Sequence, residues 1–243
     1  WLIASLLILL ALNRWIAAHV QGVGLLISNS RVTAVWFYFF LFLPGILIHE
    51  LSHYLTARLL GVKVSRFSLW PGVKRGGELV LGSVQVRGAG PVRHSLVGVA
   101  PLLFGSLAVL LIGRLLRFDA LGQAAAGGSL QRLLDAALES LTTPDFWLWL
   151  YLLFAIANAM LPSESDRLYW TPVLIFVAAI AGVGVGLDMI PAIPPNVQTY
   201  AVNFVTFLAS AFSIAVAVDL LFVIVITLLE AALAVTTGRK VQY

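Results

Sequence analysis

Six long apolar segments dominate this sequence, and each is close to the length that a membrane crossing requires. A spanning helix needs about 20 mostly apolar residues, because the hydrocarbon core of a bilayer is about 30 Å thick. The predicted spans cover residues 2–18, 34–60, 95–116, 146–161, 170–190 and 197–235. The last segment exceeds the length of one crossing, so we expect it to be tilted, broken or extended out of the bilayer.

The composition favours the same interpretation. Of the 243 residues, 60% are hydrophobic and 11% are charged, whereas soluble domains are about half apolar and about a quarter charged. Intrinsic disorder is excluded, since it requires low hydrophobicity and high charge. The absence of cysteine excludes disulfides, thiolate zinc sites and a cysteine nucleophile. We therefore predict an all-α multi-pass membrane protein in which residues 1–243 form a single membrane domain.

Basic residues are distributed unevenly between the two sides that six spans define. The side with both termini and the loops 61–94 and 162–169 holds Lys63, Arg66, Lys74, Arg75, Arg87, Arg93, Arg167, Arg239 and Lys240. The opposite side holds only Arg31, Arg117 and Arg132. Since cytoplasmic loops carry the excess of Lys and Arg, both termini are predicted to be cytoplasmic. Topology accounts for the basic loops, so no nucleic-acid partner is expected. Arginine outnumbers lysine twelve to three, which favours a GC-rich prokaryotic genome and hence a plasma membrane.

Two connecting segments carry patterns of their own. Residues 62–69 and 84–87 alternate between apolar and polar side chains, which predicts a small β-hairpin or sheet at the membrane surface between the second and third spans. In residues 129–141, leucines recur at helical spacing opposite charged residues. This pattern predicts an amphipathic helix that lies on the membrane, with Ser129 as its N-cap.

The chemically informative residues are His49-Glu50-Leu51-Ser52-His53 in the second span. On a helix, positions i and i+4 share a face, so His49 and His53 can bind one metal ion. Glu50 would then lie beside a metal-bound water, where it can act as a general base. Ionisable residues inside a span are costly to bury and are functional by default. We therefore predict a metal site here.

A third ligand is expected, because a catalytic zinc usually has three protein ligands and one open position. The fourth span returns to the side where His49 and His53 lie, and this brings Asp166 and Glu164 near them. Glu78 in the β insertion is a weaker alternative. Asp219 and Glu230 lie in the last span, where we expect each to make a structural hydrogen bond.

Over about residues 40–166, the chain resembles the site-2 protease family of intramembrane zinc metalloproteases. The resemblance rests on His49-Glu50-Leu51-Ser52-His53, Ala57, Gly61-Val62-Lys63-Val64, Phe67, Pro71-Gly72, Ala100-Pro101-Leu102, and the pair Asn158 and Asp166. It implies that Asp166 is the third zinc ligand and that Asn158 stabilises the substrate carbonyl oxygen. It also implies a three-helix catalytic core at 34–166 with a β insertion at 62–93, which is too short for a PDZ domain. Residues 1–20 and 170–235 would then be accessory spans.

The predicted function is that of a zinc-dependent intramembrane endopeptidase whose substrates are membrane proteins or membrane peptides. The active site would open toward the cytoplasm, and an edge of the β insertion could hold the unwound substrate. The main alternative is a catalytically silent zinc-binding or interaction protein of the same fold. A different membrane zinc peptidase, with Glu164 or Glu78 as ligand, and a transporter that uses Asp219 and Glu230 also remain open.

Overall fold

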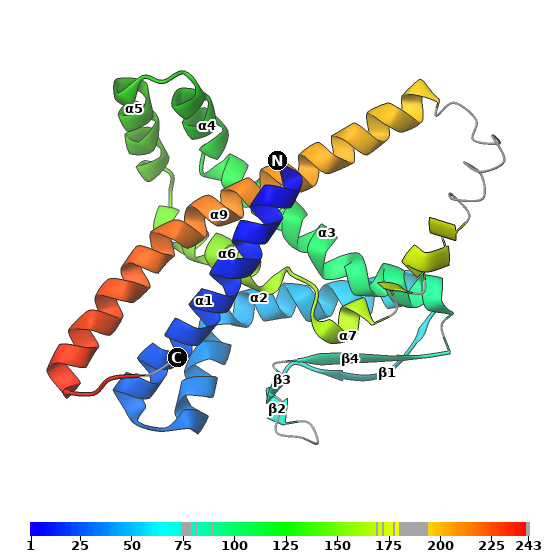
Figure 1. Cartoon of the computed structure of the whole chain (residues 1–243), viewed down its shortest axis with the longest axis horizontal. Coiled ribbons are helices and arrows are strands. Elements are labelled where there is room, and N and C mark those ends of the chain that lie inside the picture. Colours follow the sequence, from blue (N-terminus) through cyan, green and yellow to red (C-terminus); the bar gives the residue numbers. More distant parts are fainter. Residues whose placement is uncertain are drawn as a thin grey trace. The chain divides into compact units, whose positions relative to one another are not determined.

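The structure is a computed structural model, shown in Figure 1. It describes residues 1–73, 79–80, 82–88, 90–168, 170–171, 173–176, 178–179 and 194–241. The chain is mostly helical, as predicted. The helices are α1 (Leu2–Ser28), α2 (Arg31–Leu59), α3 (Pro91–Leu115), α4 (Phe118–Ala126), α5 (Leu130–Leu141), α6 (Phe146–Ala159), α7 (Glu164–Arg167) and α9 (Pro195–Thr237). The strands are β1 (Lys63–Ser68), β2 (Gly72–Val73), β3 (Leu79–Val80) and β4 (Ser83–Arg87).

Within the described residues, four helices are long and apolar enough to cross a membrane: α1, α2, α3 and α9. A fifth span results if α5 and α6, which are bent by 98° at a short break, are counted together. The predicted fourth span corresponds to α6, whose 14 residues extend only about 21 Å at about 1.5 Å per residue. The predicted fifth span, 170–190, falls mostly outside the described residues.

The last apolar segment forms one long helix. We expected it to be tilted, broken or extended beyond the bilayer, and α9 runs through 43 residues as a single element. A break within it is therefore excluded. Its length of about 65 Å is about twice the thickness of the hydrocarbon core. A tilt and an extension beyond the bilayer therefore stay predictions.

The chain divides into two compact units. The first comprises residues 1–45, 105–159 and 208–243, and the second comprises residues 46–104 and 160–207. In the first unit, Phe154 of α6 packs against Phe42 of α2 and stacks on Phe222 of α9. Gly45 permits this packing, because a Cβ atom there would overlap the backbone carbonyl of Ala155.

Polar contacts also join the helices of the first unit. Asn158 Nδ2 donates to Asp219 Oδ1 at 2.7 Å, and Asn13 Nδ2 donates to the Asn158 carbonyl at 2.7 Å. His19 Nδ1 lies 2.7 Å from Glu230 Oε2. As predicted, Asp219 and Glu230 are both hydrogen-bonded. These contacts link α1, α6 and α9 within the first unit.

The β insertion belongs to the second unit and contains the predicted sheet. Strands β1 and β4 are antiparallel, from the pair Lys63↔Arg87 to the pair Ser68↔Ser83, and β2 pairs with β3. Gly61 ends α2 at a φ of 67°, which suits glycine at a helix C-terminus. The chain then enters β1 directly. A small apolar cluster attaches the sheet to α2 and α3: Ala57, Val62 and Val97, with Leu60, Val64 and Val86 packed against them.

The predicted amphipathic helix is α5, and Ser129 is its N-cap with an oxygen that accepts from Arg132 N. The helix buries Ala136 and Ser140, and it exposes a row of leucines: Leu130, Leu134, Leu138 and Leu141. Arg117, just before α4, forms an ion pair with Glu139 of α5. The location of α5 on a membrane surface stays a prediction.

Candidate metal centre

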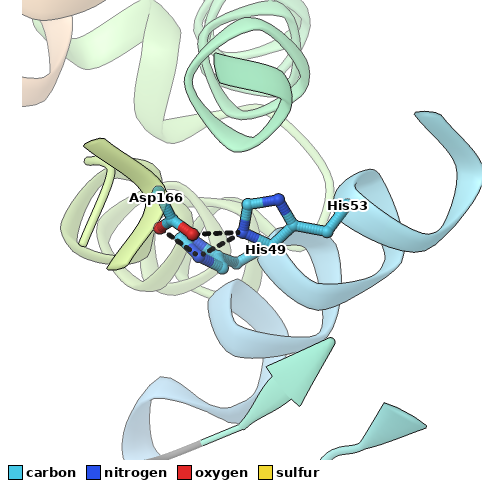
Figure 2. A group of neighbouring side chains, drawn as sticks. All are labelled: His49, His53 and Asp166. Carbon is cyan, nitrogen blue, oxygen red and sulfur yellow. Dashed lines mark hydrogen bonds and ion pairs between the residues drawn. The ribbon is translucent and has the colours of Figure 1, made fainter. Parts of the chain in front are cut away.

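The two histidines of the sequence motif lie one turn apart on α2 and point toward the same place. Their Nε2 atoms are 3.1 Å apart. Asp166 of α7 faces them, with Oδ1 at 3.1 Å from His53 Nε2 and Oδ2 at 3.5 Å from His49 Nε2 (Figure 2). Helix α2 therefore supplies two donors through its i, i+4 spacing, and a short helix distant in sequence supplies the third.

This group can hold a metal ion. One ligand atom from each of His49, His53 and Asp166 lies within 4.8 Å of the others. Tetrahedral ligands about 2.1 Å from a zinc ion lie about 3.4 Å from one another, which is close to the separations observed. Two imidazoles and a carboxylate are also a donor set that zinc accepts in catalytic sites.

Of the carboxylates considered from the sequence, Asp166 is the one that the structure brings to the histidines. Glu164 is exposed and is not part of the group. Glu78 falls outside the described residues. Burial raises the pKa of the Asp166 carboxyl, but its contacts with His49, His53 and Ser163 outweigh burial and hold that pKa well below its usual range. The carboxylate is therefore ionised at neutral pH, as a metal ligand must be.

Glu50 follows His49 and is close enough to interact electrostatically with His49, His53 and Asp166. Its side chain is buried, with 7% of its surface exposed. Its Oε2 atom has no hydrogen-bond partner within the described part of the chain. A buried polar atom without a partner usually marks a water or an ion. Glu50 thus has the surroundings expected of a base that acts on a bound water.

The residue just before β4, Gly82, packs directly on Glu50. A Cβ atom added to Gly82 would lie 2.7 Å from Glu50 Oε1 and 2.8 Å from Glu50 Cγ. These separations are too short for any side chain at residue 82 unless the glutamate moves. The β insertion therefore forms one wall around Glu50, and glycine at residue 82 is what permits the close contact.

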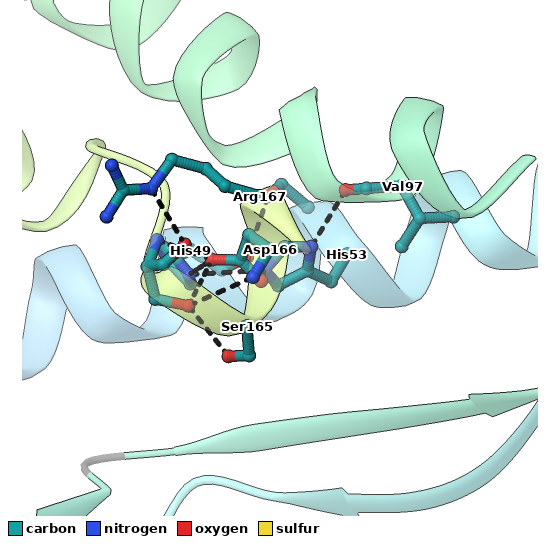
Figure 3. Close-up of polar contacts among 8 residues, drawn as sticks. His49, His53, Val97, Ser165, Asp166 and Arg167 are labelled. Carbon is teal, nitrogen blue, oxygen red and sulfur yellow. Dashed lines mark hydrogen bonds and ion pairs between the residues drawn. The ribbon is translucent and has the colours of Figure 1, made fainter. Parts of the chain in front are cut away.

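A carbonyl of α3 orients His53. Its Nδ1 atom donates to the Val97 carbonyl oxygen at 2.8 Å, as Figure 3 shows. With the proton on Nδ1, the Nε2 lone pair is available to a metal, which is the usual arrangement of ligating histidines. The next residue, Gly98, lies against α7, because a Cβ atom there would overlap the Asp166 carbonyl oxygen. One turn of α3 thus contacts two of the three ligands.

A capping box fixes the Asp166 side chain. Ser163 is the N-cap of α7, and its backbone N and Oγ donate to Asp166 Oδ2 at 2.7 and 2.6 Å. In return, Asp166 N donates to Ser163 Oγ at 3.3 Å. Because Ser163 occupies Oδ2, Oδ1 is the oxygen better placed to bind a metal. Arg167 Nε donates to the Ser163 carbonyl at 3.3 Å and adds to the same turn (Figure 3).

Asn158, the second catalytic residue expected from the family resemblance, belongs to the other compact unit. Its side chain is buried there, and Nδ2 donates both to the Phe154 carbonyl at 3.0 Å and to Asp219 Oδ1 at 2.7 Å. Both amide hydrogens therefore have partners within that unit. The role of Asn158 toward a substrate stays a prediction.

Ser163, Val97, Gly98 and Gly82 were not identified from the sequence as parts of the site. The spacing Ser163-x-x-Asp166 resembles a capping box and could have indicated the serine. Pro101 within a helix could have indicated an unusual carbonyl four residues earlier. The close approaches at the two glycines have no local signal, because they depend on contacts between distant segments.

Comparison with protein-family models, with curated proteins and with solved structures found no match. The candidate function therefore depends on the geometry of the site itself.

Proposed function

We propose that this protein is a zinc-dependent intramembrane endopeptidase. The observation that carries the proposal is the group of His49, His53 and Asp166 with buried Glu50 beside it. The two histidines and Glu50 lie on α2, a helix long and apolar enough to span a membrane. A structural metal site has no use for an unpartnered carboxylate next to its ligands. A hydrolytic site requires one, because the attacking water must lose a proton.

Each residue of the proposed site has a distinct role in the reaction. His49, His53 and Asp166 would hold a zinc ion, which supplies a Lewis acid that acidifies water and polarises a peptide carbonyl. Glu50 accepts the water proton through Oε2 and returns it to the leaving amine. Val97 and Ser163 keep the His53 ring and the Asp166 carboxylate in place. The finer topology belongs to the same proposal: six spans, cytoplasmic termini, a site open to the cytoplasm and a prokaryotic plasma membrane.

The proposed substrate is a transmembrane segment that unwinds locally. A helix hides its carbonyl groups in hydrogen bonds, so the segment to be cleaved must become extended. Within the described residues, β1 pairs with β4 and each leaves one edge. Since Gly82, the residue just before β4, lies next to Glu50, a substrate strand added to the sheet would lie beside the proposed base.

A catalytically silent metal-binding protein is the second candidate. The observation that favours it is the hydrogen bonding of Asn158, whose two amide hydrogens are taken by Phe154 and Asp219. To stabilise a substrate oxyanion, Asn158 would have to break one of these two hydrogen bonds and donate that hydrogen to the substrate. A silent protein would bind the metal but hydrolyse no peptide.

Metal analysis and a cleavage assay test the proposal together. In nanodiscs, the purified protein without substitutions (the parent) is expected to carry about one zinc per chain, as a three-ligand site requires. It should cleave transmembrane peptides from a diverse library, and a chelator should stop cleavage until zinc is returned. A folded parent that takes up no zinc would refute the proposal, and a zinc-loaded parent without cleavage would favour the silent protein.

The proposed addition of a substrate strand to the β1–β4 sheet leads to a separate prediction. Proline in place of Ser65 in β1 or Gln85 in β4, both exposed, removes a backbone N–H. On the strand that holds the substrate, we expect cleavage to fall about fivefold or more, the equivalent of one backbone hydrogen bond, with the zinc content unchanged. Threonine at the same positions keeps the N–H and favours a strand, so these variants serve as controls. Unchanged cleavage in these variants and in proline variants at the neighbouring positions of both strands would exclude strand addition, because only alternate N–H groups of a strand face its free edge.

A further inference from the structure

Helix α3 contains a proline in its interior, at Pro101. In an α-helix, the N–H of each residue donates to the carbonyl four residues earlier. Proline has no N–H, and its ring also crowds that carbonyl. The Val97 carbonyl therefore lacks its normal helical donor and can accept from a group outside the helix.

The Val97 carbonyl is the group that accepts the hydrogen bond from His53. The distance from His53 Nδ1 to this oxygen is 2.8 Å, and the contact is buried (Figure 3). In a helix without proline, the N–H of residue 101 and the His53 ring would compete for the Val97 carbonyl oxygen. Because residue 101 is proline, no N–H from that position competes with His53 Nδ1 for the Val97 carbonyl.

We propose that Pro101 is a positioning residue of the metal centre: it frees the Val97 carbonyl, which fixes the tautomer and the orientation of the His53 ring. The inference rests on the proposed metal site and goes beyond it, because Pro101 touches neither metal nor substrate. Partners of this kind set the lone-pair direction and the basicity of ligating histidines. Gly98 lies on the same turn and contacts the backbone of Asp166, so a shift of this turn would also disturb the third ligand.

Restoring an N–H at residue 101 should weaken metal binding without weakening the helix. In Pro101→Ala, the new N–H donates to the Val97 carbonyl and competes with His53 Nδ1 for it. Loss of a partner of this kind typically lowers metal affinity about 10- to 100-fold, and we expect at least about a tenfold loss here. Alanine is a better helix former than proline, so thermal stability of the metal-free protein should be unchanged or higher.

The experiment compares Zn²⁺ affinity by chelator competition in nanodiscs for the parent, Pro101→Ala, Pro101→Gly and Pro91→Ala. Glycine also restores the N–H but is a poorer helix former than alanine, so both variants at residue 101 should lose affinity alike although they differ from each other in stability. Pro91 begins α3, where a proline frees no carbonyl of the helix, and its variant should bind Zn²⁺ like the parent. The Co²⁺ absorption spectrum should shift in the residue-101 variants alone.

Parent-like Zn²⁺ affinity and Co²⁺ spectra in both residue-101 variants would overturn the role of Pro101 while leaving the metal site intact. An equal loss of affinity in Pro91→Ala would also overturn it, because the effect would then follow from any change in α3. A parent that binds no Zn²⁺ would refute the metal site itself, and with it the positioning role.

Discussion

Asp166→Ala is expected to lose the metal, with zinc per chain falling from about one to below about a tenth under dialysis, because two histidines alone leave a zinc site one ligand short. The structure supplies the reason for so large an effect. Asp166 Oδ1 lies 3.1 Å from His53 Nε2, and no other carboxylate joins the group within the described residues. Elemental analysis of the purified variant measures this directly.

Glu164→Ala is the matched control for that loss. Glu164 lies two residues earlier on the same short helix, and its side chain is exposed. Its removal should leave zinc near the parent value. The reverse result, with zinc kept in Asp166→Ala and lost in Glu164→Ala, would mean that α7 presents a different face to the histidines. In that case Glu164 would be the third ligand.

The sequence was sufficient for the parts of this fold that depend on local patterns. Long apolar segments predicted the helices that are long and apolar enough to span a membrane, alternation predicted the β1–β4 sheet, and leucine spacing with Ser129 predicted α5. The i, i+4 histidines of α2 needed only helical geometry to meet. Topology then narrowed the third ligand to Asp166 and Glu164, with Glu78 as a weaker alternative. Of the described carboxylates among these, Asp166 is the one that lies beside the histidines.

The remaining features depend on contacts between segments that the sequence does not pair. The bounds of α6 are close to the predicted 146–161, but the 98° bend between α5 and α6 has no signal in the apolar pattern. The carbonyl that orients His53 lies 44 residues further along the chain. Gly82 and Gly98 are required by close approaches to Glu50 and to Asp166. Such pairings are set by packing. Pro101 marks the Val97 carbonyl as unusual, but no sequence pattern shows which side chain that carbonyl meets.

Glu50→Gln is expected to abolish peptide hydrolysis and to keep the metal. Glutamine has nearly the same shape, so the contact with Gly82 is preserved, but its amide cannot accept the proton of the attacking water. General acid–base catalysis contributes about 10²- to 10⁴-fold to a rate, and cleavage should fall by about that factor. The fold should tolerate the change, because a neutral amide is less costly to bury than a carboxylate.

The measurement pairs a cleavage assay with zinc analysis on the same preparation. Glu164→Gln provides the control, since it makes the same chemical change at an exposed site and should leave both quantities near the parent values. Zinc retained with cleavage lost in Glu50→Gln alone would assign the proton transfer to Glu50. Cleavage at the parent rate would remove Glu50 from the reaction and would count against the proposed mechanism, which depends on its buried and unpartnered Oε2 atom.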